Sequence, residues 1–179
     1  MRKIFIPVLL LFLLTACNLP RAIADPHPSF ATDTPSDQPC YFNWATQPLP
    51  DLSTQIQAAM NATGLTGVSA IAEAYGENCY DAKTDQPVGF GAIETDFHIT
   101  VKVAELTNKD DLGNLLEKIL VVLDGFPIGK IPGSEPGYIG VSFQTGNDEL
   151  NLSFTAKAGK SARDQGLHGA ALFEELQNK

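Results

Sequence analysis

The strict alternation of apolar and polar residues over 96–103, in a predicted strand from Asp96 to Leu106, constrains the fold more than any other feature of this sequence. Every second position is apolar: Phe97, Ile99, Val101 and Val103. The positions between them are polar or charged: His98, Thr100 and Lys102. Because successive side chains of a strand point to opposite faces, this pattern predicts a strand with one buried and one solvated face. A one-residue slip in register would bury every polar side chain, so the pattern also determines which face is internal.

Three further segments have strand-like patterns. Residues 68–75 place small apolar side chains on one face: Val68, Ala70, Ala72 and Ala74. Residues 138–143 and 150–157 predict a hairpin across Gly146-Asn147-Asp148. The side chains of this hairpin expected to point inward are Ile139, Val141, Phe143, Leu150, Leu152 and Phe154. Together with the first strand, these segments predict four strands.

Other segments have the spacing of amphipathic helices. Residues 51–63 carry apolar side chains at intervals of three and four, which indicates one helix face. Thr107-Asn108-Lys109-Asp110 resembles a capping box, and the leucine-rich stripe that follows it extends to Leu123. A last helix is expected from about Gly169 to Gln177. The stripe before Leu123 is the most apolar, so its helix should be the most buried.

This order, helix-strand-strand twice and then a helix, predicts an α+β fold. We expect a two-layer sandwich: one four-stranded, mostly antiparallel sheet with helices on one face and polar side chains on the other. Residues 76–94 are expected to form a long connection, which in a compact domain is functional or disordered. Tyr41, Phe42 and Trp44 are expected to pin the start of the domain onto the core, and the alternative is an aromatic ligand platform.

Composition and charge narrow the class of partner. Hydrophobic residues make up 44% of the chain and charged residues 18%, which is typical of a globular protein. The formal net charge is −9. A chain this acidic repels nucleic acid and anionic lipid headgroups, so we expect neither to be a partner of the folded domain.

The N-terminal residues have the layout of a secretory signal. A basic start, Arg2 and Lys3, precedes an apolar run over residues 4–14 that is too short to span a bilayer. Leu14-Thr15-Ala16-Cys17 resembles the lipobox of bacterial lipoproteins at all four positions. The resemblance implies that Cys17 receives a diacylglycerol thioether and becomes the mature N-terminus, anchored to the cell membrane on its extracytoplasmic side. The expected organisation is a signal peptide (1–16), a lipidated, proline-rich tether (17–39) and one domain (40–179).

Two cysteines remain once Cys17 carries lipid. Cys40 and Cys79 form an even pair in an oxidising compartment, so a disulfide between them is the simplest expectation. The alternative is a metal-binding or catalytic thiol. The chain has no CxxC and no clustered histidines, which argues against that alternative.

The polar face of the predicted sheet is the candidate binding surface. Its residues are Glu73, Tyr75, His98, Lys102, Asn151, Ser153 and Thr155. A carboxylate near a histidine could bind metal or transfer protons, but alternating polar residues are also what any one-sided sheet shows to water. Gly159-Lys160-Ser161 resembles the end of a phosphate-binding loop, yet Phe154 stands where that motif needs glycine, so a polar turn is expected there.

These observations predict a non-enzymatic module. No Gly-x-Ser-x-Gly elbow, HExxH or CxxC motif occurs in the chain, and we expect no cofactor and no metal. We therefore expect a lipid-anchored extracytoplasmic binding domain with a protein partner in the cell envelope. The alternative function is a small extracytoplasmic hydrolase or metal-binding protein that uses the polar sheet face.

Overall fold

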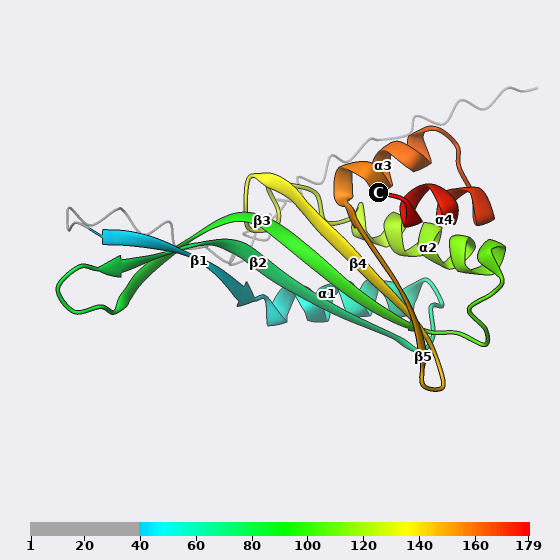
Figure 1. Cartoon of the computed structure of the whole chain (residues 1–179), viewed down its shortest axis with the longest axis horizontal. Coiled ribbons are helices and arrows are strands. Elements are labelled where there is room, and N and C mark those ends of the chain that lie inside the picture. Colours follow the sequence, from blue (N-terminus) through cyan, green and yellow to red (C-terminus); the bar gives the residue numbers. More distant parts are fainter. Residues whose placement is uncertain (1–39) are drawn as a thin grey trace, which may run out of the picture. The chain divides into compact units, whose positions relative to one another are not determined.

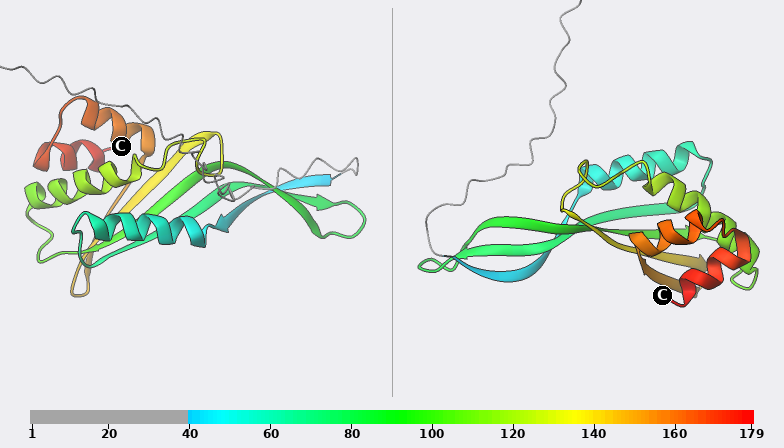
Figure 2. Two further views of the ribbon diagram at one scale, coloured as in Figure 1. Left: turned by 180° about the vertical axis from the view of Figure 1, so that it is seen from behind. Right: turned by 90° about the horizontal axis from the view of Figure 1, so that it is seen from above.

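The computed structural model describes residues 40–179 and confirms an α+β fold. The elements run in the order β1 (Cys40–Pro48), α1 (Pro50–Ala62), β2 (Val68–Asp81), β3 (Pro87–Lys102), α2 (Lys109–Leu123), β4 (Glu135–Thr145), β5 (Asp148–Thr155), α3 (Ala156–Asp164) and α4 (Gly169–Gln177). The strands form one sheet in the order β1-β2-β3-β4-β5, with the helices against one face (Figures 1 and 2). In this part of the chain, no helix has the length and apolar character needed to cross a bilayer.

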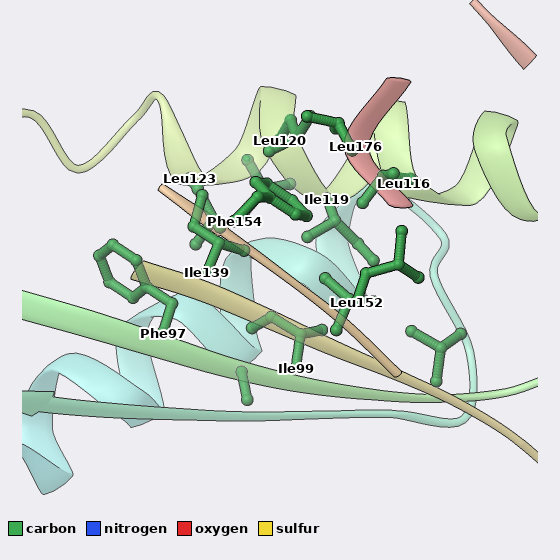
Figure 3. Packing of buried hydrophobic residues seen from close by; sticks show 14 of the residues in the cluster. Phe97, Ile99, Leu116, Ile119, Leu120, Leu123, Ile139, Leu152, Phe154 and Leu176 are labelled. Carbon is green, nitrogen blue, oxygen red and sulfur yellow. The ribbon is translucent and has the colours of Figure 1, made fainter. Parts of the chain in front are cut away.

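The core lies between the sheet and the helices, as the alternation on β3 predicts (Figure 3). Phe97, Ile99 and Val101 are 5%, 1% and 1% exposed. The leucine-rich stripe of α2 packs in the same cluster through Leu116, Ile119, Leu120 and Leu123. His98 and Lys102 remain exposed on the opposite face of the sheet. The register of β3 is therefore the one that buries its apolar side chains.

The sheet differs from the predicted one in its number of strands and contains one parallel pairing. It has five strands rather than four, because residues 40–48 form β1 and pair antiparallel with β2. Three of its four pairings are antiparallel, so the sheet is mostly antiparallel as predicted, while β3 and β4 run parallel. A parallel pair needs a long crossover connection, and α2 provides it between these two strands.

The prediction of a long connection over residues 76–94 is wrong. β2 continues to Asp81 and β3 begins at Pro87, so only a short turn separates them. Gly76 lies at a shift in the register of β2 and β3, where an added Cβ would overlap the carbonyl oxygen of Gly91. Gly76, which suggests a loop in the sequence, instead permits the close approach of two strands.

The C-terminal half contains a helix that the sequence pattern did not predict. Residues 156–164 form α3, where a polar turn was expected. The Thr155 hydroxyl caps this helix by accepting a hydrogen bond from the Ala158 N–H at 3.1 Å. Gly159 is buried, and an added Cβ would lie 3.1 Å from both Leu120 and Phe154. Glycine at this position allows α3 to pack closely on the core.

The three predicted helices are confirmed within one or two residues at their ends. The cap of α2 lies one residue later than expected, at Asn108 instead of Thr107. The Asn108 side chain accepts a hydrogen bond from the Asp111 N–H at 3.3 Å and donates one to the Asp111 carboxylate at 2.7 Å. The first of these bonds satisfies a backbone donor that the first turn would otherwise leave free, as an N-cap does, and the second joins the two side chains.

Candidate functional site

The polar residues predicted as a binding face lie on the helix-free side of the sheet. Glu73 and Tyr75 come from β2, His98 and Lys102 from β3, and Asn151, Ser153 and Thr155 from β5. They do not converge, because Gly140 of β4 stands in register between His98 and Ser153. Two strand spacings separate those two residues by about 10 Å. The face is therefore a broad surface and not a pocket.

Glu73 and His98 are the two members of this set that the structure brings together. The His98 Nε2 atom lies 3.6 Å from Glu73 Oε2, and their side chains are 53% and 35% exposed. This distance is beyond a good hydrogen bond, and exposed ion pairs contribute little energy. Among residues 40–179, no three His, Cys, Asp or Glu side chains gather closely enough to hold a metal ion. This geometry supports surface contact better than catalysis.

A second surface extends past the helices. We define the distal ribbon as residues 40–48 and 75–94, which comprise β1 and the adjoining ends of β2 and β3 (Figure 1). Tyr41, Phe42 and Trp44 are 42%, 60% and 61% exposed there. The expectation that they pin the chain onto the core is wrong, because all three are exposed and none belongs to the buried core cluster.

Ring stacking holds the aromatic side chains of the distal ribbon in place. Trp44 stacks on Tyr75 with ring centroids 5.3 Å apart and planes within 4°. Tyr41 stacks on Tyr80 with centroids 5.4 Å apart and planes within 14°. Tyr41 and Trp44 are three residues apart in one strand, so the two stacks lie on opposite faces. The ribbon therefore presents ordered rings on both faces without burying them.

The predicted disulfide fastens the distal ribbon. Cys40 and Cys79 are bonded, with their Cα atoms 5.6 Å apart, so this prediction is confirmed. The bond links the first residue of β1 to the outer end of β2. It therefore restrains the edge strand that carries the most exposed rings.

The turn at the end of the ribbon is ordered by Asp81. Its carboxylate accepts hydrogen bonds from the backbone N–H groups of Thr84 and Lys83 at 2.8 and 2.9 Å and from the Thr84 hydroxyl at 3.1 Å. These bonds, the Thr84 N–H first, lower the pKa of Asp81. The Tyr41 hydroxyl donates a hydrogen bond to Asp85 and ties the turn to β1.

The distal ribbon is acidic. It contains four carboxylates and one cation: Glu77, Asp81, Asp85, Glu94 and Lys83. Burial raises the pKa of Glu94, and the nearby charges of Asp96 and Glu135 raise it further. The rings of the ribbon are therefore surrounded by negative potential.

One signal in the sequence could have located this surface. The predicted disulfide already brings residue 40 next to residue 79, which places the aromatic residues of 41–44 beside Tyr75 and Tyr80. Six aromatic residues then fall in a single short ribbon: Tyr41, Phe42, Trp44, Tyr75, Tyr80 and Phe90. Their exposure was not predictable, because it depends on how far the helices extend over the sheet.

Comparison with known proteins gives no match: no family model, no curated protein and no solved structure is detectably similar to this chain. Function is therefore inferred from the geometry of residues 40–179.

Proposed function

We propose that this chain is a lipid-anchored, extracytoplasmic binding module of the bacterial cell envelope and that its distal ribbon contacts a partner protein. The observation that carries the proposal is the 60% and 61% exposure of Phe42 and Trp44 on a disulfide-fastened strand. Water solvates large rings poorly, so clusters of exposed aromatic residues mark interaction surfaces. Aromatic residues also dominate the energetic centres of protein interfaces.

The charge of the ribbon suggests the chemistry of the partner. The exposed rings are flanked by Glu77, Asp85 and Glu94, with Lys83 as the single cation of the ribbon. Complementary charge steers association and disfavours wrong partners. The proposed partner therefore presents an apolar patch bordered by lysine and arginine residues.

Order in the free ribbon favours binding. The two ring stacks and the Asp81 hydrogen bonds restrict the conformations of β1 and the turn. A surface that is ordered before it binds loses less conformational entropy in the complex. The ribbon should therefore bind as a preformed surface and change little in shape.

The proposal also includes a lipid anchor at Cys17. Cys17 and the tether 17–39 lie outside the described residues, and their support is the four-residue resemblance at Leu14-Thr15-Ala16-Cys17. Intact-mass measurement of the chain purified from its host tests this directly. Wild type should carry a diacylglyceryl modification, and Cys17→Ser should remain an unlipidated precursor. Masses of wild type and variant that differ only by the Cys-to-Ser substitution would refute lipidation.

Capture of the partner tests the ribbon. The full chain, purified from detergent-solubilised membranes, should retain a partner that the double variant Phe42→Ser/Trp44→Ser loses. Val121→Ser is the matched control, because Val121 is 55% exposed on α2, away from the ribbon. The control should retain the partner. Retention by the double variant, or equal loss by the control, would refute the proposed surface.

A further inference from the structure

A cavity on the helix side of the sheet has the features of a second binding site, distinct from the distal ribbon. Its volume is about 480 Å³, within the range of small-molecule sites. The sheet contributes Phe97 and Ile139, α2 contributes Leu120 and Leu123, and the α2–β4 connection contributes Phe126 and Ile128. The lining is therefore predominantly apolar.

The Thr95 hydroxyl in the wall of this cavity is not free to bind a ligand. Thr95 is 1% exposed and lines the cavity from β3. Its hydroxyl donates a hydrogen bond to the Pro132 carbonyl oxygen at 2.6 Å. A polar ligand group placed there would lose its hydrogen bonds to water and gain none from the Thr95 hydroxyl. An apolar group would instead contact apolar side chains. The interior therefore favours an apolar ligand segment.

The rim of the cavity is cationic. Lys157 and Lys160 line it from the first turns of α3, and Asp124 lines it from the end of α2. The Asp124 carboxylate is paired with Arg163 at 2.5 Å, so it does not neutralise the lysines. Lys160 forms an exposed pair with Asp164 at 2.8 Å, and Lys157 forms no ion pair within residues 40–179. In a chain of net charge −9, this is a local site of positive charge.

We infer that this cavity binds an amphiphile with an acyl chain and an anionic head, the chain in the apolar interior and the head at Lys157 and Lys160. The free positive charge at the rim selects an anionic head over a neutral one. The same chemistry occurs in a free fatty acid and in a single-chain anionic phospholipid. This site lies on the opposite face of the sheet from His98 and Lys102, so it is independent of the predicted polar face.

Calorimetric titration with monomeric dodecanoate tests the inference. The protein is the full chain carrying Cys17→Ser, so that lipid on that cysteine cannot occupy the cavity. We expect saturable binding of one dodecanoate per chain, and binding of dodecanol weaker by about tenfold or more. Lyso-phosphatidylglycerol, titrated in parallel below its micelle concentration, distinguishes the two sources. Saturable binding of either anionic probe supports the inference. The probe that binds more tightly identifies the source of the ligand, a free fatty acid or a phospholipid.

Variants locate the site. Lys157→Glu/Lys160→Glu should weaken dodecanoate binding by about tenfold or more, and Lys102→Glu, a single substitution of the same kind on the opposite face, should leave it unchanged. Ala156→Phe, which adds a ring at the cavity wall, should weaken binding of the alcohol as well as the acid while the chain still unfolds cooperatively. Absence of saturable dodecanoate binding, equal affinity for dodecanol, or an equal loss in Lys102→Glu would overturn the inference. Binding only to anionic phospholipid vesicles would also overturn it, because that result places the interaction on a membrane surface.

Discussion

The indole ring of Trp44 lies 5.3 Å from the phenol ring of Tyr75 in a parallel stack, on the face of the sheet opposite the buried side chain of Ala74. This contact links β1, an edge strand, to β2 through side chains as well as backbone hydrogen bonds. It also holds Trp44 in one orientation while leaving 61% of it exposed. The same contact therefore stabilises the pairing of β1 with β2 and holds the exposed Trp44 ring in place.

A double-mutant cycle measures that contact. Trp44→Ala and Tyr75→Ala should each destabilise the domain, and their coupling energy from urea unfolding should be about 0.5–1.5 kcal/mol. Trp44→Ala combined with Tyr80→Ala is the control cycle, because Tyr80 stacks on the opposite face. Its coupling should be below about 0.3 kcal/mol. Equal coupling in the two cycles would contradict the assignment of the stacks to opposite faces.

Removal of the disulfide should destabilise the domain strongly. The bonded residues are separated by 39 positions, and the chain-entropy model gives about 4 kcal/mol for a loop of this length. Cys40→Ser/Cys79→Ser should therefore unfold at lower urea concentration, with a loss of about 2–4 kcal/mol. Reductant should lower the stability of the wild type but not of the variant. A loss below about 1 kcal/mol would show that the closed loop contributes little.

The register of β3 predicts opposite effects for two adjacent substitutions. Val101 is 1% exposed in the core, and Lys102 is exposed on the other face. Val101→Asp buries an unpaired charge, which costs several kcal/mol against a total stability of about 5–15 kcal/mol, so the domain should unfold. Lys102→Asp should melt within a few degrees of the wild type. Circular dichroism distinguishes the two results, and similar melting of both variants would contradict the two-layer fold.

The raised pKa of Glu94 predicts a pH-dependent gain from Glu94→Gln. An acid whose pKa is higher in the folded state destabilises the fold as the pH rises from its ordinary pKa through the raised one, because its ionised form is disfavoured by burial and by Asp96 and Glu135. The variant should therefore melt about 1–2 °C higher than the wild type at pH 7. The difference should vanish below about pH 4, where glutamate is protonated in both states.

Glu105→Gln controls for the change in net charge. Glu105 is exposed near the opposite end of β3, away from Asp96 and Glu135. It should leave the melting temperature at pH 7 unchanged. A gain from Glu94→Gln that persists undiminished at low pH would contradict the electrostatic explanation.

The core was predictable because its signal is local. The alternation on β3 and the stripe on α2 each encode one buried face, and two such faces have to pack together. β1 was not predictable in this way, since Tyr41, Phe42 and Trp44 put rings on both faces and show no alternation. The parallel pairing of β3 with β4 depends on the path of the crossover, which periodicity does not encode.

The candidate surfaces, like the fold, were predictable only where their signal in the sequence is local. Alternation placed the seven predicted polar residues on the helix-free face, but it could not show that β4 separates His98 from those on β5. The cavity beside Lys157 and Lys160 depends on α3, whose Gly159 suggests a turn until its packing against Leu120 and Phe154 is known. Sites assembled from several elements therefore required the structure.

Site-specific photo-crosslinking in the native host tests the proposed binding surface most directly. A photoreactive phenylalanine analogue at position 44 of the full chain should give one covalent adduct with a partner protein in the cell envelope. The same analogue at position 121, on the exposed face of α2, should give none. The absence of an adduct from position 44, or an equal yield from position 121, would contradict the distal ribbon as the binding surface.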